Sequence, residues 1–582
     1  MTLPEGLQVL VLDADMVPAL TIARSLLRRK CQVDIASHVE RPLASYSRNI
    51  RAVYRHPDAL ADTQGFLDWL AVHCKSRHYD LVIPVTERSL TPLSGSRERF
   101  EHVKIAMPST DSLEVVLDKS QTLALATRLG VAVPAGVTVN SVDEVAALQD
   151  SLRYPVVLKP ARSIGVREGG ASHLQVSYAF DPIGLITGCS HALRFGPVLL
   201  QEYFSGDGVG VELIARSGEI AYAFQHRRLH EVPLTGGGSS LRVSEPVNAE
   251  LFEASRRLIR ALDWNGVAMV EFKLNRSSGE YCLMEINGRF WGSLPLASAA
   301  GADFPAMLLE LELTGSITPG GAYRNGIYCR LLSRDLMWYE SVLRGGEDAR
   351  IAHVPSRWEV LKGLGLFLHP RHRFDVQALR DPRPGLVDLG RIISRYCQRL
   401  SGVVRHDWFL LGQKIAWRRG KVNAALSTAN TILFLCYGNI NRSALADALV
   451  RGYAADAAGV RVCSAGFHPQ EGRPADPVMQ EIAAESGLDM HKQRSSMLTA
   501  ELLASSDIIF VMEKRHYDRL VEQAPELAGK IFLLGAHPSE RKQSAEIEDP
   551  FGLPREAYLH CYARIAEAID HVKAIVATRS AE

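Results

Sequence analysis

The 582-residue chain lacks the features that would assign it at once to several specialised classes of protein. Its nine cysteines are scattered without a Cys-x-x-Cys pair, which argues against a disulfide framework or a zinc site. Its formal net charge is only +1, so the whole chain gives no electrostatic case for binding nucleic acid. No apolar run is long enough to span a bilayer, and the start, MTLPEGLQVLVLDAD, lacks the basic residues and apolar core of a signal peptide. We therefore expect a cytoplasmic protein without a transmembrane segment.

The composition that remains is that of an ordinary globular protein, spread over more length than one core can use. Hydrophobic residues account for 47% and charged residues for 23% of the chain, both close to globular averages. Because single hydrophobic cores stop growing at about 250–300 residues, the length predicts three or four domains.

The first third of the chain alternates apolar segments of strand length with helical segments. Strands are expected over residues 7–13, 32–37 and 79–85, and a helix over residues 19–29. Such alternation predicts a parallel sheet covered by helices. No Gly-x-Gly-x-x-Gly follows the first strand, so a dinucleotide site lacks support. Glu87 follows the third strand, where α/β sheets bind ligands, although a solvated loop glutamate fits the same position.

The most informative segment, TILFLCYGNINRSALADALV, places a cysteine between a strand and a helix. Residues 431–435 are apolar and predict a buried strand, and the chain from Ser443 onward predicts a helix. Cys436 and Arg442 lie between the two, six residues apart. A loop of this kind surrounds a tetrahedral anion with backbone N–H groups, and the helix N-terminus adds a positive dipole end. The pattern predicts that a thiolate attacks phosphorus while the guanidinium binds two phosphate oxygens.

The context of this loop favours catalysis over the ordinary interpretation, a buried and inert cysteine. Gly438 and Asn439 suit a loop that needs unusual backbone angles. Far downstream, the segment EIEDPFG places Asp549 before a proline on an expected loop. A phosphocysteine mechanism needs an acid for the leaving oxygen and then a base for water, and one carboxyl group can serve both steps.

Residues 431 to about 575 resemble low-molecular-weight protein tyrosine phosphatases. The resemblance rests on four motifs in the family's order: CYGNINRS at 436–443, CSAG at 463–466, DIIFVMEKRH at 507–516 and DPFG at 549–552. It implies that Cys436 is the nucleophile, Arg442 the phosphate clamp and Asp549 the general acid. It further implies that Ser443 hydrogen-bonds the thiolate and that Asn439 braces the loop.

Cysteine placement separates this chain from some members of that family. Asn441 stands before the arginine, where the family often carries a second cysteine, so the protective local disulfide is not available. Arsenate reduction, which uses the same fold with further relay cysteines, is the least favoured alternative. Neither Cys463 nor Cys561 lies where the local loop would place such a relay.

A different set of charged residues lies within residues 116–315. Lys119 falls on an expected helix, and Lys159 ends an expected strand that precedes the glycine-containing loop ARSIGVREGGA. Glu202 falls on the strand VLLQEYF. For each of these residues taken alone, a solvated surface position is the ordinary interpretation.

Two later strands, VAMVEFKLN and YCLMEINGRFWGS, carry carboxylates. Residues two apart on a strand face the same side, so Glu285, Asn287 and Arg289 are expected to point together. They point toward Glu271 if the two strands form a hairpin across SSGE. Two carboxylates and an amide oxygen form a hard-oxygen site suited to magnesium. The alternative is a solvated sheet edge.

Taken together and in this order, these residues resemble the ATP-grasp superfamily over the first 320 residues. The resemblance implies an ATP-dependent enzyme that phosphorylates a carboxylate to an acylphosphate, which an amine or another nucleophile then attacks. It implies ATP and Mg²⁺ as cofactors, with Mn²⁺ as an alternative metal. The implied metal ligands are Glu271, Glu285 and Asn287, and Arg289 would steady the transferred phosphoryl group.

The same resemblance implies how the nucleotide is held. Lys119 and Lys159 would contact its phosphates, and the loop that contains Gly165 would close over them. Glu202 and Tyr203 would form the hinge that holds the adenosine. The loop is less glycine-rich than in other members of the superfamily.

The segment from Phe224 to Glu245 is expected to shape the acceptor site. Arg228, His230 and Arg242 are candidates for holding a substrate carboxylate, with solvated loop charges as the equal alternative. The three glycines at 236–238 make a closing loop plausible.

A basic region is expected to join the two enzymes. Apolar residues recur there at helical spacing, and Arg391, Arg395 and Arg399 form a stripe. A basic amphipathic helix over 386–421 can make a peripheral membrane contact, but packing against its own domains with the arginines in solvent is the favoured interpretation.

These observations predict a multidomain α/β and α+β protein, with a doubly wound parallel sheet in its phosphatase part. The expected divisions are a Rossmann-like pre-ATP-grasp domain at 1–115, an ATP-grasp domain at 116–320, a mostly helical basic linker at 321–428 and a phosphatase domain at 429–582.

We expect a bifunctional enzyme whose ligase half joins a small-molecule carboxylate to an amine or another nucleophile. The phosphatase half would act on a phosphotyrosine protein, for example a bacterial tyrosine kinase. In the alternative, both halves serve one small-molecule pathway and the phosphatase acts on a phosphomonoester metabolite. A deep cleft with aromatic walls would favour phosphotyrosine.

Overall fold

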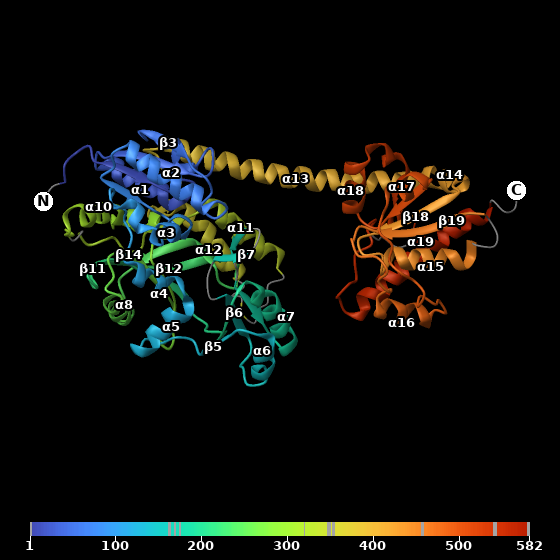
Figure 1. The fold of residues 1–582 in the computed structure, drawn as a ribbon, viewed down its shortest axis with the longest axis horizontal. Helices are drawn as coiled ribbons and strands as arrows, with labels where there is room; N and C mark the ends of the chain where they lie inside the picture. Colours follow the sequence, from blue (N-terminus) through green and yellow to red (C-terminus); the bar gives the residue numbers. More distant parts are fainter. Residues whose placement is uncertain are drawn as a thin grey trace. The chain divides into compact units, whose positions relative to one another are not determined.

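The structure is a computed structural model that describes residues 3–160, 164–167, 170–173, 176–318, 321–345, 351, 355–454, 459–538 and 544–578. The chain divides into two compact units, Met1–Ile393 and Ser394–Glu582, whose elements are labelled in Figure 1. Among the described residues, no helix combines the length and the apolarity needed to cross a membrane.

The N-terminal unit begins with a parallel sheet in the order β3-β2-β1-β4. Its strands are β1 (Gln8–Val11), β2 (Gln32–Ser37), β3 (Ala52–Arg55) and β4 (Leu81–Ile83). Helices α1 (Val17–Arg28) and α2 (Thr63–Ser76) pack against it. The predicted parallel sheet with covering helices is confirmed. Strands β1 and β4 are parallel neighbours, so their carboxyl ends lie side by side at one edge of the sheet.

Two antiparallel sheets follow in the same unit. The smaller sheet runs in the order β5 (Gly136–Val139), β10 (Val198–Glu202), β6 (Val156–Pro160), β9 (Ser177–Ala179). The larger sheet runs in the order β15 (Tyr281–Asn287), β14 (Gly266–Leu274), β11 (Asp207–Arg216), β12 (Glu219–Val232), β13 (Gly238–Glu245), β16 (Tyr328–Arg330), β17 (His372–Phe374). Strands β14 and β15 pair as an antiparallel hairpin with Glu271 opposite Glu285, as the sequence predicted.

The segment predicted as the loop ARSIGVREGGA contains a second hairpin. Strands β7 (Ile164–Arg167) and β8 (Gly170–His173) pair with Gly165 opposite Ser172, while 161–163 and 168–169 lie outside the described residues. The loop prediction was therefore wrong at Gly165. β-Branched Ile164 and Val166 alternate around it and favour an extended backbone over the irregular loop that the glycines suggested.

The predicted linker at 321–428 also differs from the structure, because its first part completes the larger sheet. Strand β16 pairs with β13, and β17 pairs with β16. Ile327 and Cys329 are buried in the core of the unit, which explains why the chain does not leave it at residue 320. The compact N-terminal unit accordingly runs to Ile393.

A single helix, α13 (Pro382–Arg418), spans the boundary between the two units. Near its end Trp417 is buried, and its indole N–H donates to the carbonyl of Leu533 at 3.0 Å, so this end belongs to the C-terminal unit. Leu400 and Trp408 are 64% and 70% exposed. The peripheral membrane contact of residues 386–421 stays a prediction.

The C-terminal unit contains a parallel sheet in the order β19-β18-β20-β21. Its strands are β18 (Thr431–Cys436), β19 (Arg461–Gly466), β20 (Ile508–Val511) and β21 (Ile531–Leu533), and helices α15 (Arg442–Ala454) and α19 (Arg555–Thr578) pack with them in one core. Five apolar residues make β18 a buried central strand, which fixes the position of the loop that follows it. The predicted strand–loop–helix order is confirmed.

Candidate active sites

The loop between β18 and α15 surrounds the sulfur of Cys436 with hydrogen-bond donors. Cys436 is 2% exposed, the backbone N–H of Asn439 donates to its Sγ at 3.2 Å, and the Ser443 hydroxyl lies 3.0 Å from it. Helix α15 begins at Arg442, so its positive N-terminal end faces the same loop. Each of these groups stabilises a thiolate or a bound anion.

Asn439 holds this loop in an uncommon conformation. Its φ is 51°, in the left-handed region that asparagine tolerates better than most residues. Its Nδ2 donates to the Ser443 hydroxyl at 2.9 Å, and its Oδ1 accepts from the backbone N–H of Ser496 at 2.8 Å. The side chain thus ties the loop to helix α15 and to the segment at Ser496, as a bracing residue would.

Arg442 is completely buried, and two carboxylates hold its guanidinium. It donates to Asp549 Oδ2 at 2.5 Å and to the carbonyl of Ile547 at 3.0 Å, and it forms an ion pair with Glu513. Burial opposes the charge of Glu513, but hydrogen bonds from Arg442 and Arg515 hold the pKa of Glu513 below its usual value. The three predicted residues Cys436, Arg442 and Asp549 therefore lie together in one site.

Glu513 was missed from the sequence, although it lies inside the motif DIIFVMEKRH. It follows the end of β20 by two residues, at the edge of the parallel sheet where Cys436 also lies. That position after a central strand was the available signal, because functional side chains gather at the carboxyl ends of parallel strands.

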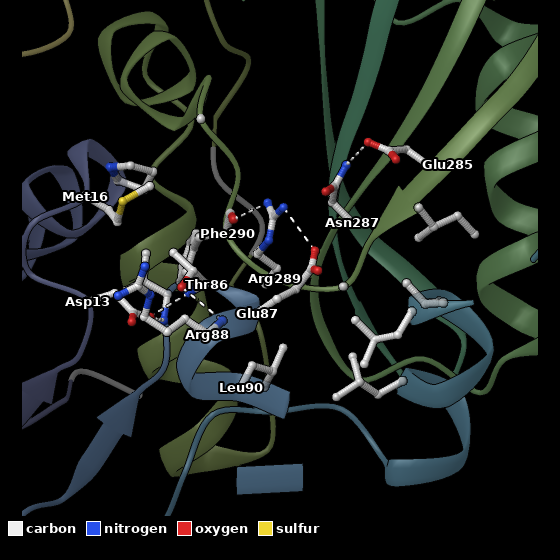
Figure 2. Close-up of a pocket in the computed structure, with 18 of the residues that line it drawn as sticks. Asp13, Met16, Thr86, Glu87, Arg88, Leu90, Glu285, Asn287, Arg289 and Phe290 are labelled. Carbon is white, nitrogen blue, oxygen red and sulfur yellow. Dashed lines mark hydrogen bonds and ion pairs between the residues drawn. The ribbon is translucent and has the colours of Figure 1, made fainter. Parts of the chain in front are cut away.

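The N-terminal unit brings the predicted metal ligands together. The Asn287 side-chain amide donates to Glu271 Oε1 at 3.0 Å and to Glu285 Oε1 at 3.4 Å, the latter drawn in Figure 2. Burial and the neighbouring Glu285 raise the pKa of Glu271. Burial opposes the charge of Glu285 as well, but nearby Lys119 and Arg289 lower its pKa overall.

The oxygens of Glu271, Glu285 and Asn287 fit a hard divalent cation. The guanidinium of Arg228 already occupies part of this set. In the described part of the chain no three His, Cys, Asp or Glu side chains cluster as a metal site, so this set rests on two carboxylates and one amide oxygen. Arg228 forms an ion pair with Glu271 and lies 3.3 Å from Glu231. Arg228 was a candidate for holding a substrate carboxylate, but in the structure it is paired with carboxylates of the protein itself. Its guanidinium neutralises one ligand, and a metal would use the remaining oxygens.

Lys159 lies on β6 within electrostatic reach of the same carboxylates. Its burial lowers the pKa of Lys159 to about 8, with Lys119 acting in the same direction and Glu285 opposing. Lys119 opens helix α5 (Lys119–Arg128) and lines a cavity with Glu285. The structure therefore groups both lysines with the acidic residues.

The predicted hinge residues lie at the end of β10, on the strand next to β6. Glu202 is exposed, and the Tyr203 hydroxyl donates to the carbonyl of Ile351 at 2.8 Å. The register places Leu199 opposite Lys159. Glu202 itself lies opposite Val156, so the hinge residues and Lys159 are on neighbouring strands but three residues apart in register.

Arg289 does not continue the strand that carries Glu285 and Asn287. Strand β15 ends at Asn287, and Gly288 packs so tightly on Trp264 that an added Cβ would lie 2.6 Å from the ring. Beyond this turn Arg289 donates to Glu87 Oε1 at 3.2 Å and to the carbonyl of Phe290 at 3.0 Å (Figure 2). The expected alignment along the strand was wrong, and Glu87 enters the site instead.

His230 and Arg242, which were candidates for a substrate carboxylate, have buried protein partners. His230 Nδ1 lies 2.7 Å from Asp335, and its ring stacks on Trp338 with centroids 3.5 Å apart. Arg242 donates to Asp375 at 2.8 Å. Both side chains stabilise the interior, so this expectation was wrong.

A cavity of about 350 Å³ lies between the parallel sheet and the end of β15. Its lining includes Asp13, Thr86, Arg88, Lys119, Glu285 and Arg289, several of which Figure 2 labels. Asp13 and Arg88 were not recognised from the sequence. Their signal was the position of Asp13 after β1 and of Arg88 after β4, at the carboxyl edge of the sheet.

Comparison with known families divides the chain in the same way. Residues 431–580 match the family model described as "Low molecular weight phosphotyrosine protein phosphatase". Residues 194–327 match the model "ATP-grasp in the biosynthetic pathway with Ter operon". The first match contains the whole group around Cys436, and the second contains Glu271, Glu285 and Asn287 but neither Lys119 nor Lys159.

Curated relatives resemble the C-terminal unit. The low molecular weight protein-tyrosine-phosphatase Wzb of Escherichia coli K12 is 38% identical over 133 residues, covering 23% of this chain and 86% of Wzb. The probable low molecular weight protein-tyrosine-phosphatase EpsP of Ralstonia solanacearum is 34% identical over 140 residues, covering 24% and 91%.

Among solved structures, Vibrio vulnificus Wzb in complex with benzylphosphonate is 33% identical, covers 25% of this chain and 97% of Wzb, and has a TM-score of 0.23. The Campylobacter jejuni biotin carboxylase is 14% identical, covers 55% and 74%, and has a TM-score of 0.44. The chain belongs to the low-molecular-weight protein tyrosine phosphatase family through its C-terminal unit, and residues 194–327 of its N-terminal unit match an ATP-grasp model.

Proposed function

We propose that the C-terminal unit hydrolyses phosphotyrosine through a cysteinyl-phosphate intermediate. The observation that carries this proposal is the set of contacts around Cys436: the Asn439 N–H and the Ser443 hydroxyl at its sulfur. Cys436 attacks phosphorus as Asp549 protonates the departing phenol oxygen. Asp549 then takes a proton from the water that cleaves the S–P bond, and the thiolate leaves.

Arg442 and Ser443 support both steps. Arg442 binds two phosphoryl oxygens as a fork, exchanging its contacts with the protein's carboxylates for the substrate's charge. Ser443 donates to the sulfur and makes it a better leaving group when water attacks.

Exposed aromatic side chains favour a phosphotyrosine protein, such as a bacterial tyrosine kinase, over a metabolite phosphomonoester. Tyr437 follows the nucleophile and is 48% exposed, and Phe551, two residues after Asp549, is 63% exposed. Both can stack on a phenol ring, which serine phosphates and sugar phosphates lack. Faster hydrolysis of serine or sugar phosphates than of phosphotyrosine peptides would support the metabolite alternative instead.

For the N-terminal unit, we propose an ATP- and Mg²⁺-dependent carboxylate ligase that forms an acylphosphate. The cluster of Glu271, Asn287 and Glu285 with Lys159 nearby carries this proposal. Magnesium, or manganese in its place, would neutralise charge on the transferring phosphoryl group. Lys119 and Lys159 would bind the nucleotide phosphates. A carboxylate oxygen attacks the γ-phosphorus, ADP leaves, and an amine or another nucleophile displaces phosphate from the acylphosphate.

The domain limits also remain proposals. We place the pre-ATP-grasp domain at 1–115 and the ATP-grasp domain from 116 onward, extended to include β16 and β17, which pair with its larger sheet. The phosphatase domain would run from 429 to the end, with Trp417 of α13 packed into its core.

The test of the ligase is ADP release by the full-length Cys436→Ser protein with magnesium-ATP, against amino acids and other carboxylates. A carboxylate that stimulates ADP formation, with a product of ligated mass when an amine is added, supports the proposal and identifies the substrate. Silence across the panel, with the wild type still cleaving a phosphotyrosine mimic, contradicts carboxylate ligation and leaves the phosphatase standing.

A further inference from the structure

The strongest sign of an unassigned binding site is the unpaired carboxylate oxygen of Asp13, directly after β1. Asp13 has a φ of 52°, in the left-handed region that aspartate and asparagine adopt more often than other non-glycine residues. The turn directs the Asp13 side chain toward the carboxyl edge of the parallel sheet, where it lines the cavity of Figure 2.

Among the described residues, only one of the two carboxylate oxygens of Asp13 has hydrogen-bond partners. Its Oδ2 accepts hydrogen bonds from the Val85 and Thr86 backbone N–H groups, at 3.1 and 2.8 Å, and from the Ser89 hydroxyl at 2.6 Å. Its Oδ1 is buried and has no hydrogen-bond partner among the described residues. Asp13 is only 2% exposed overall, and it lines the cavity. A buried oxygen of this kind is costly unless a ligand donates to it.

The charges around Asp13 specify what that ligand must carry. Asp15 lines the same cavity and adds negative charge, with His38 3.9 Å from its carboxylate. The cavity's three cationic side chains act on other carboxylates: Arg88 pairs with Asp58 at 3.1 Å, Arg289 pairs with Glu87 at 3.2 Å, and Lys119 lowers the pKa of Glu285. Burial raises the pKa of Asp13, and Asp15 adds to this effect. The missing donor is therefore expected to be a cation.

We propose that Asp13 binds the ammonium group of an amino acid, and that this amino acid is the carboxylate substrate of the ligase. The inference rests on the proposed ligase function. One ammonium N–H would donate to Asp13 Oδ1, while the substrate carboxylate would lie toward Asn287 and Glu285. A cavity of about 350 Å³ is in the range of small-ligand sites.

The ammonium at Asp13 is not the nitrogen that attacks the acylphosphate. An α-ammonium is two bonds from its own carboxyl carbon and could attack it only by closing a strained three-membered ring. The ammonium held by the Asp13 carboxylate therefore stays protonated and serves recognition, and the attacking amine comes from a second molecule.

The experiment compares amino acids with their 2-hydroxy acid counterparts, which keep the carboxylate and lack the ammonium. ADP release with magnesium-ATP is measured for the full-length chain and for Asp13→Asn, which retains an acceptor for the three donors at Oδ2. We expect at least one amino acid to be turned over with kcat/KM about tenfold or more above its hydroxy acid. Asp13→Asn should remove this preference, lowering kcat/KM for the amino acid alone and leaving the KM for ATP unchanged.

Ser89→Ala is the matched control, because it removes one hydrogen bond to Asp13 and leaves its charge in place. It should keep the preference for the amino acid. Equal turnover of amino acid and hydroxy acid by the wild type would overturn the ammonium site while leaving the ligase intact. No ADP release with any carboxylate would overturn the ligase and this inference together. The comparison of analogues on the wild type needs no variant, so misfolding of Asp13→Asn cannot conceal the answer.

Discussion

Asp549 and Glu513 both contact the guanidinium of Arg442. Substituting each carboxylate in turn therefore separates acid catalysis from phosphate binding by experiment. Asp549→Asn and Glu513→Gln each remove one carboxylate from Arg442 and keep a side chain of the same shape. Only Asp549 is assigned to proton transfer. The two variants therefore form a matched pair: both lose a negative charge beside Arg442, but only Asp549→Asn loses the general acid.

The expected magnitudes follow from the contacts. Arg442 keeps one carboxylate and the Ile547 carbonyl in either variant, so the buried guanidinium should lose one charge-assisted hydrogen bond in each, about 1.5–3 kcal/mol of unfolding free energy. Glu513→Gln also weakens the contact with the exposed Arg515, which should add little. Removal of a general acid should lower kcat/KM, which reports the first chemical step, about 100- to 10,000-fold for a leaving group as basic as tyrosine. That loss should shrink as the leaving oxygen becomes less basic, because such an oxygen departs without a proton.

The assay is steady-state hydrolysis of aryl phosphates that carry progressively weaker leaving bases, for the wild type and both variants. Asp549→Asn should show a steep dependence of kcat/KM on the leaving-group pKa. Glu513→Gln should lower the rate by a similar factor for every substrate. Parallel lines for Asp549→Asn and the wild type would refute its role as the acid.

Three further outcomes are expected. Cys436→Ser should abolish phosphatase turnover and leave ADP release intact, and loss of both activities would show coupling between the halves. Burial lowers the pKa of Lys159 from 10.5 to about 8, so its charged form becomes scarce above that pH. ATP affinity measured by calorimetry should fall about tenfold between pH 7 and pH 9, a decline that Lys159→Arg should remove and that an unchanged wild-type affinity would contradict. Trp417→Ala should cost about 3–5 kcal/mol in chemical denaturation, whereas Trp408→Ala on the same helix, 70% exposed, should change stability by about 0.5 kcal/mol or less.

The phosphatase loop could be predicted because its chemistry is local in the sequence. Cys436, Asn439, Arg442 and Ser443 lie within eight residues, and the strand and helix that hold them have clear patterns. Asp549 was reached through its motif. Glu513 was not, because its role exists only through an ion pair with Arg442 formed in three dimensions.

The ligase site was predicted less completely because residues from different sheets form it. Periodicity placed Glu271 opposite Glu285, since a hairpin is a local structure. It could not show that Gly288 ends the strand against Trp264 and turns Arg289 toward Glu87. Likewise, nothing in the sequence indicated that Arg228 has a protein partner. That partner, Glu271, lies 43 positions away on β14, which is separated from β12 by one strand of the sheet.

The two carboxylates on Arg442 also bear on how the phosphatase ends its cycle. Inorganic phosphate, the product of the second step, must leave a buried guanidinium that would attract it strongly. Glu513 and Asp549 are anions already placed to take its position, so the departing product exchanges with internal counter-ions and no bare charge is left in the interior. Weaker product inhibition by phosphate in the wild type than in Glu513→Gln is the kinetic signature of such an exchange.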